Sequence, residues 1–454
     1  MSHAAPAADA RTERLLAAPI LPTLLRLSAP GALLVVFQSM ISIGDTWFVS
    51  RLGTVPLAGL ALVFPLLMLL QMTSAGAMGG GVASAIARAL GAGDLVTVRR
   101  LVVHALAIAL ALGIAFTLLL RGFGRPVYRL LGAQDATVGF ALAYSNVVFG
   151  GAILVWLANT LASALRGTGN MLLPALTLSA ATLVHVPLSG SLVLGLGPMP
   201  QLGIAGAGVA YVTTFGLSAL AMTFAVFRGG SLLRPRAGDF RLERRLFREI
   251  LRVGGISVAS SAQTVLTTVV LTGFVGRFGT AALAGYGVGL RLELLQIPLV
   301  FAVGQAMVAL VGTHVGAGRA LRAKKIAFAG GGLAAGVSLA IGVTITIVPQ
   351  AWMGLFSADA AVLDAGARYL RTVGLCYPFL AVGLALYFAS QGAGQVLWPV
   401  LAGTARLLIV VAGGSAVLAA GAGLQSVFAV IAIAMLIFGV LTALAVTRAV
   451  WGVR

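Results

Sequence analysis

The sequence predicts an all-α integral membrane protein made of two copies of one helical unit. The chain of 454 residues is 60% hydrophobic and 9% charged, with a mean hydropathy of +1.06, whereas soluble domains carry about 25% charged residues. Short loop sequences of the first half also recur in the second half at a nearly constant distance. These observations predict twelve transmembrane helices in two lobes of six.

Apolar segments of at least the ~20 residues that cross a bilayer follow one another along the chain. The spans expected in the first half are 27–50, 55–80, 101–121, 138–163, 172–196 and 203–227. Those expected in the second half are 253–276, 281–311, 326–350, 367–390, 397–420 and 424–447. Because six is an even number, both copies enter the membrane in the same direction, and a pseudo-twofold axis along the membrane normal is expected to relate them.

Three loops of the first half return in the second, two of them after 225 residues and one after 226 residues. They are Leu-Gly-Ala-Gly at 90–93 (Val-Gly-Ala-Gly at 315–318), Arg-Gly-Thr-Gly at 166–169 (Gln-Gly-Ala-Gly at 391–394) and Arg-Leu-Gly-Thr at 51–54 (Arg-Phe-Gly-Thr at 277–280). A period this long indicates a duplicated domain rather than a solenoid.

The distribution of the net charge of +19 predicts the topology. An N-lobe at 1–227 and a C-lobe at 253–454 are joined by a linker at 228–252 that is rich in arginine, and further basic groups follow the even-numbered spans. This positive-inside pattern predicts a multi-pass protein of the cell (inner) membrane with both termini in the cytoplasm. Because topology and lipid headgroups account for the basic charge, nucleic acid is not an expected partner.

Sequence motifs of enzymes are missing from this chain. No phosphate loop, HExxH zinc motif or GxSxG elbow occurs, and the single Cys376 excludes an internal disulfide. The first nineteen residues lack the hydrophobic core of a cleavable signal peptide. We therefore expect no enzymatic activity, no cofactor and no metal site, and transport driven by an ion gradient is the default function.

Two of the eleven acidic residues, Asp45 and Glu293, lie inside expected spans. An ionised carboxylate in a bilayer costs several kcal/mol unless it is paired or hydrated, so such residues are usually functional. A structural role remains open for each: Asp45 could pair with Arg51 or cap a neighbouring helix, and Glu293 or Arg291, two residues away, could each reach a nearby opposite charge.

Asp45 and His185 of the first half have no ionisable counterparts in the second half. At an offset of 226 residues Asp45 corresponds to Leu271, and at 225 residues His185 corresponds to Val410. A purely architectural role would more naturally occur in both copies. An ion-handling site built from Asp45 and His185 is therefore expected within the first six helices.

The first span also carries Pro30, which predicts a bend or hinge because proline removes a backbone hydrogen bond. Gln38 lies seven residues before Asp45, so both are expected to project from one helix face. With Gln71 and Asn159 they are expected to line a polar cavity. The alternative for each amide is a hydrogen bond between helices, worth about 1 kcal/mol.

These residues resemble the multidrug and toxic compound extrusion (MATE) family. The stretch from Pro30 through Asp45 to Gly53 is similar to the first helix of these transporters, and the loops at 90–94 and 166–169 are similar to those after their second and fourth helices. The resemblance covers the whole chain and implies the MATE fold, with a V-shaped central cavity. It also implies export of organic, often cationic, compounds against an inward flow of H⁺ or Na⁺.

Departures from the family pattern favour H⁺ as the coupling ion. At the fifth-helix positions where sodium-coupled members often carry Asn and Asp, this chain has His185 and Ser189, and the span at 253–276 offers Gln263 in place of a glutamate. Asp45 is retained, as in the branch that resembles DinF, the DNA-damage-inducible protein F. The expected proton-coupling residues are therefore Asp45 and His185.

The resulting hypothesis is a monomeric antiporter that exports cationic amphipathic compounds in exchange for H⁺. The residues expected to bind substrate are Gln38, Asp45, Gln71, Asn159, Gln263, Arg291 and Glu293. Small organic substrates and membrane lipids are the expected partners. The alternatives are a Na⁺-coupled drug antiporter and a flippase for lipid-linked precursors or polysaccharides.

Overall fold

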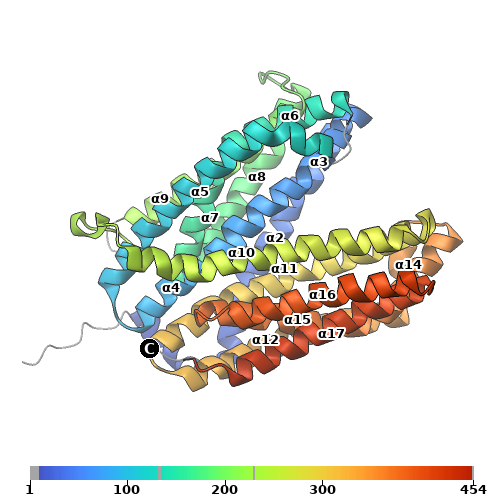
Figure 1. The fold of residues 1–454 in the computed structure, drawn as a ribbon. Helices are drawn as coiled ribbons and strands as arrows, with labels where there is room; N and C mark the ends of the chain where they lie inside the picture. The colour runs from blue at the N-terminus through green and yellow to red at the C-terminus, as the bar shows by residue number, and fades with distance from the viewer. Residues whose placement is uncertain (1–9, 131–133, 229–230, 452–454) are drawn as a thin grey trace, which may run out of the picture. The chain divides into compact units, whose positions relative to one another are not determined.

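The computed structural model describes residues 10–130, 134–228 and 231–451, and these fold into helices without a strand (Figure 1). Eleven of the described helical segments are long and apolar enough to cross a membrane, or up to twelve if α6 (Asp135–Gly150) and α7 (Ala152–Gly167), which meet at a bend of 48°, form one span. The predicted all-helical membrane fold is therefore confirmed.

The chain divides into two compact units at points that differ from the predicted lobes. The N-unit comprises Ala29–Gly254, and the C-unit comprises Met1–Ser28 together with Gly255–Arg454. Two helices, α2 (Ile20–Ser50) and α10 (Arg244–Gly276), each begin in one unit and continue in the other. The predicted linker at 228–252 thus belongs to the N-unit, because the buried Leu246 and Ile250 lie in its hydrophobic core.

Nine further elements build the N-unit between α2 and α10. They are α3 (Thr54–Gln71), η1 (Met72–Met78), α4 (Gly79–Gly91), α5 (Leu95–Leu130), α6, α7, α8 (Leu172–Leu194), α9 (Ile204–Phe227) and η2 (Ala237–Phe240). The segments α3, η1 and α4 form one continuous candidate span, in which η1 is a π-helix. Among the long helices, α8 and α9 pack together most extensively and carry part of the site described below.

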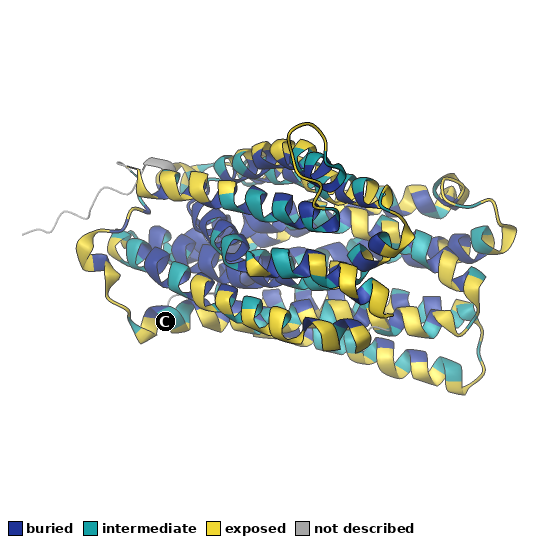
Figure 2. Cartoon of the chain, turned by 90° about the horizontal axis from the view of Figure 1, so that it is seen from above, coloured by how far each residue is buried: buried dark blue, intermediate teal, exposed yellow. Residues whose placement is uncertain are grey.

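The C-unit repeats this helix order. It contains α1 (Ala10–Ala17), α11 (Thr280–Gly316), α12 (Ala320–Ile347), α13 (Pro349–Met353), α14 (Ala360–Val373), η3 (Gly374–Cys376), α15 (Tyr377–Gly392), α16 (Leu397–Ala419) and α17 (Leu424–Arg448). Large apolar side chains such as Leu118, Phe224 and Ile347 are about 70% exposed, and exposed positions run along helices of both units (Figure 2). Such surfaces are unfavourable in water but suit contact with lipid.

The repeated loops adopt the same backbone conformation in both units. Positive φ angles occur in pairs, at Gly93 (76°) and Gly318 (73°) and at Gly169 (75°) and Gly394 (75°). This left-handed conformation ends a helix and strongly favours glycine. The sequence repeat therefore reflects repeated structure and not only similar composition.

Ion pairs fix the arginine-rich segment before α10 to the N-unit. Arg99 bonds Asp239 at 2.9 Å, and Arg100 bonds Glu243 at 2.6 Å. Burial by itself raises the pKa of Asp239, but the hydrogen bonds from the Arg236 N–H and Arg99 outweigh burial and hold that pKa below its usual range. The segment is thus a docked part of the N-unit rather than a free connection.

Candidate functional site

Asp45 lies on α2 in the interior of the N-unit, with 4% of its surface exposed. Its expected structural partner, Arg51, instead places its guanidinium 4.7 Å from the ring centre of Trp47. The helix α2 is continuous through Pro30, which causes no break in this structure. The carboxylate is therefore held by groups other than the nearby arginine.

His185 and Ser189, one turn apart on α8, both reach the same carboxylate oxygen. His185 Nε2 lies 3.0 Å from Asp45 Oδ1, and Ser189 donates to the same Oδ1 at 2.5 Å. On its other side, His185 Nδ1 lies 3.0 Å from the hydroxyl of Thr214 on α9. The predicted proximity of Asp45 and His185 is present, and Ser189 and Thr214 complete the cluster.

Counting hydrogens at these contacts shows what the cluster can do. Thr214 has one hydroxyl hydrogen, which points either to the Ala210 carbonyl, 2.8 Å away, or to His185 Nδ1. If the Thr214 hydrogen points to the Ala210 carbonyl, His185 Nδ1 must carry a hydrogen of its own in order to bond the Thr214 oxygen. A second proton then lies between His185 Nε2 and Asp45 Oδ1. If the Thr214 hydrogen points to Nδ1, the only proton of the pair lies between Nε2 and Oδ1. The two arrangements differ by one proton and one unit of charge.

A second polar cluster connects three more helices of the N-unit. Asn159 on α7 donates through Nδ2 to Gln71 Oε1 at 3.0 Å and to Ser74 Oγ at 2.8 Å. Gln71 Nε2 in turn lies 2.6 Å from the hydroxyl of Tyr211. Tyr211 is one turn before Thr214 on α9, so the same helix carries contacts to both clusters.

The π-helix η1 explains the change of the repeat offset from 226 to 225 residues. The span Thr54–Gly91 has 38 residues, whereas its counterpart Thr280–Gly316 has 37 residues and is α-helical throughout. A π-helical turn absorbs one extra residue without rotating the flanking helix, and it is frequent at functional sites. Here it presents Ser74, and the hydroxyls of Thr73 and Ser74 bond the carbonyl of Leu70.

In the C-unit the counterparts of the charged cluster are apolar. Leu271 and Val410, which correspond to Asp45 and His185, are 5% and 1% exposed and lie in one hydrophobic cluster. Ser189 corresponds to Gly414, and a side chain at Gly414 would collide with the ring of Phe274. The ionisable cluster is thus a feature of the N-unit, as predicted.

Replacement of Leu271 by Ala should lower stability without changing proton coupling. Removal of a buried leucine side chain typically costs 2–5 kcal/mol in soluble cores. The thermal midpoint of the purified protein measures this loss, and Leu266→Ala, which alters a 49% exposed leucine of the same helix, is the control. A selective loss of proton coupling at normal protein levels would instead implicate the C-unit directly.

Glu293 on α11 is 7% exposed and accepts a hydrogen bond from Tyr369 on α14 at 3.1 Å. Its main charge partner is Arg406 on α16, not Arg291, which stacks over the ring of Phe356 at 5.4 Å. The expectation that Glu293 could reach a nearby opposite charge agrees with this arrangement, and the charge comes from another helix because residues two apart on a helix point in different directions.

The remaining expected site residues do not join the Asp45 cluster. Gln263 of the C-unit donates to Thr404 at 2.8 Å. Gln38 lies at an exposed position of α2, whereas Asp45 is buried, so the structure does not bring Gln38 into the Asp45 cluster. Asp45 is covered by His185 and Ser189 of α8, which bond its carboxylate. Within the described part of the chain, no group of three or more His, Cys, Asp and Glu side chains could hold a metal ion.

Three hydroxyl-bearing residues of these clusters are not distinguished by the sequence: Ser74, Thr214 and Tyr211. Hydroxyl residues are common in membrane helices, and their side chains often bond the backbone of the preceding turn, as Thr182 does to Leu178. Only the packing of α8 against α9, and of α7 against η1, distinguishes the few that meet a partner on another helix.

A duplicated set of membrane-spanning helices with a buried carboxylate–imidazole pair in one copy is typical of a secondary transporter. The MatE family model matches residues 30–189 and 256–415, one match in each copy. The chain therefore belongs to the MatE family, whose members are the MATE transporters.

Three relatives illustrate this membership. A protein named FAD transporter of Shewanella oneidensis is 26% identical and covers 83% of this chain and 82% of its own. The probable multidrug resistance protein NorM of Thermotoga maritima is 22% identical, and the match covers 83% of this chain and 81% of NorM. The multidrug export protein MepA of Staphylococcus aureus is 23% identical and covers 85% of both chains.

Solved structures agree on the fold. A MOP superfamily transporter from Pyrococcus furiosus superposes with a TM-score of 0.88 at 23% identity and covers 96% of this chain and 98% of its own. A MATE protein in a bent conformation gives the same score with 96% and 97% covered. The chain is thus a multi-pass MATE transporter by family and by fold.

Proposed function

We propose that this protein is an antiporter that exports cationic amphipathic compounds in exchange for H⁺. The observation that carries the proposal is the contact between His185 and Asp45, backed by Thr214. This pair exists in a state with a shared proton and no net charge and in a state with one fewer proton and one negative charge. A proton carrier and a cation-binding site are then the same group of atoms.

The transport cycle follows from the two charge states. In its negative state the pair attracts a cationic substrate, whose charge it compensates in a site with little water. Protonation from outside removes that charge and releases the substrate. The rotation of the Thr214 hydroxyl between Ala210 and His185 accompanies the change of state. Release of the proton to the cytoplasm resets the site.

The remaining residues of the hypothesis have supporting roles. Gln71 and Asn159 orient the substrate through the cluster at η1, and Gln38, Gln263, Arg291 and Glu293 are further substrate contacts. Pro30 is the hinge of α2. The amides of Gln71 and Asn159 are engaged with one another in this structure, so substrate binding must exchange the bonds of Asn159 for bonds to the ligand.

The energy available depends on stoichiometry. One H⁺ exchanged for one monovalent cation moves no net charge, so only the pH gradient drives it, at ~1.4 kcal/mol for each pH unit. An exchange that moves one net charge inward would add ~2.3 kcal/mol for each 100 mV. We propose a monomer in the cell (inner) membrane with both termini in the cytoplasm, in keeping with its basic segments.

FAD is the second substrate to consider, because one relative is named an FAD transporter. FAD is anionic at neutral pH. Among the described residues, the side chains bonded to those of Asp45, Gln71 and Asn159 include no Lys or Arg. That chemistry favours a cation over a dinucleotide in the N-unit. Coupling to Na⁺ instead of H⁺, and the flipping of lipid-linked precursors or polysaccharides, are competing hypotheses for the same fold.

The coupling ion is tested with the purified protein in sealed vesicles. An imposed pH gradient without Na⁺ should drive accumulation of a fluorescent organic cation, and nigericin in K⁺ medium should stop it. A Na⁺ gradient at equal pH, with a protonophore present, should drive nothing, because Na⁺ needs several converging oxygens. Robust transport driven by Na⁺ at clamped pH would overturn the proposal, and FAD offered in place of the cation tests the second substrate.

A further inference from the structure

Corresponding basic residues of the two units differ in how they are neutralised. In the N-unit, Arg99 and Arg100 near the start of α5 are paired with carboxylates of the segment before α10. Their counterparts 225 residues later are Lys324 and Lys325, near the start of α12 in the C-unit. Among the described residues, no ion pair reaches either lysine.

The same holds for the arginines beside them. Arg319 donates to the Leu16 carbonyl at 3.1 Å, and Arg322 donates to the Ala18 carbonyl at 2.7 Å. Within the described chain both lack a carboxylate partner, and the buried Nε of Arg322 has no hydrogen-bond partner. Carbonyl oxygens carry only partial charges, so no described carboxylate pairs with the positive charges of Arg319 and Arg322.

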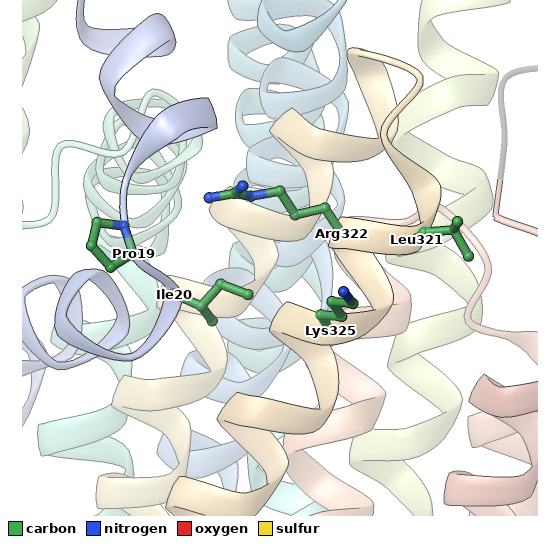
Figure 3. A pocket seen from close by; sticks show the side chains of 5 residues that line it. All are labelled: Pro19, Ile20, Leu321, Arg322 and Lys325. Atoms are coloured by element: carbon green, nitrogen blue, oxygen red, sulfur yellow. The ribbon is translucent and has the colours of Figure 1, made fainter.

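A pocket of about 500 Å³ opens beside these cations and is lined by Pro19, Ile20, Leu321, Arg322 and Lys325. Figure 3 shows Arg322 extending from α12 toward the segment at Pro19. Leu321 is 81% exposed, and Lys325 is also exposed. The lining therefore combines two cationic groups with apolar side chains.

The position of the pocket selects its ligand. It lies where α2 and α12 begin, and both helices are candidate membrane spans, so the pocket is at a membrane surface. The first turn of α12 also directs its free N–H groups and its positive dipole end to this place. A pocket that places apolar side chains next to cationic groups fits a lipid with an anionic headgroup better than it fits a soluble ion.

We propose that this pocket binds an anionic glycerophospholipid. Its phosphate is held by Lys325 and by the guanidinium of Arg322, which both line the pocket, through charge-assisted hydrogen bonds. Its glycerol and acyl region lies against Ile20 and Leu321. Basic pockets between membrane helices bind anionic headgroups in this manner. The site does not depend on the transport mechanism proposed above.

Native mass spectrometry of the purified full-length protein, with added phosphatidylglycerol or phosphatidylcholine, tests this site. The wild type should retain phosphatidylglycerol in preference to phosphatidylcholine. Lys325→Gln should weaken its binding about fivefold, the effect of one lysine near an anionic surface. Arg448→Gln is the matched control, because Arg448 is an exposed cation at the same end of the helices, next to the residue that Lys324 bonds. It should leave binding within about twofold of wild type.

Three results would overturn the proposal. The first is equal retention of phosphatidylglycerol by wild type and Lys325→Gln. The second is an equal loss in Lys325→Gln and Arg448→Gln, which would indicate general surface charge. The third is displacement of the lipid by inorganic phosphate at the same concentration, which would indicate a site for a free anion. Because the side chain of Lys325 is exposed and has no hydrogen-bond partner among the described residues, its replacement should not unfold the protein.

Discussion

Replacement of Asp45 by Asn should abolish proton-coupled efflux while the protein still folds and inserts. Asn has nearly the volume of Asp and still accepts the hydrogen bond from Ser189, but it cannot exchange a proton with His185. The pair can then be neutral or positive but never negative, so it no longer exchanges a proton for a cationic substrate. We expect the efflux rate in vesicles to fall to that of vesicles without protein.

The control for this variant is Asp364→Asn, which removes a carboxylate whose side chain is 58% exposed and pairs with Arg368 at 2.8 Å. An exposed pair of this kind contributes at most about 1 kcal/mol, so efflux should be unchanged. Wild-type pumping by Asp45→Asn would show that Asp45 is structural and that the two-state pair does not couple transport.

Deletion of Ala75 from η1 should produce a folded protein that no longer transports. The deletion turns the π-helical segment into a regular α-helix of the length found in the C-unit, which has 37 residues. The flanking helices keep their register because the π turn had absorbed the extra residue. The backbone at Ser74 shifts, however, and Asn159 can no longer donate to both Gln71 and Ser74. Vesicle efflux and the thermal midpoint measure the two effects separately.

A deletion in a regular helix is the matched control. Removal of Leu299 from α11 rotates everything beyond it by about 100°, which should expose the buried face of that helix and prevent stable folding. If the Ala75 deletion transports at the wild-type rate, η1 does not position the site. If the Ala75 deletion lowers the thermal midpoint as much as the Leu299 deletion does, η1 does not accommodate one inserted residue.

The sequence by itself determined the class of fold. Membrane helices must satisfy their backbone polar groups internally, so long apolar segments predict their own secondary structure with little help from tertiary context. The duplication was equally readable, because glycines such as Gly93 and Gly318 must adopt left-handed conformations that other residues avoid. Asp45 and His185 stood out for a similar reason, since an ionisable group in an apolar span is costly and therefore rare.

Only the tertiary structure decided which groups meet. Nothing in the spacing of Thr214 or Tyr211 separates them from hydroxyls that merely bond their own helix. The contact of Glu293 with Tyr369 and the neutralised state of Arg99 likewise depend on which helices are packed together. Periodicity along one helix fixes a face to within tens of degrees, but a hydrogen bond requires atoms of two helices within about 3 Å. That precision comes from packing, which no single segment of sequence contains.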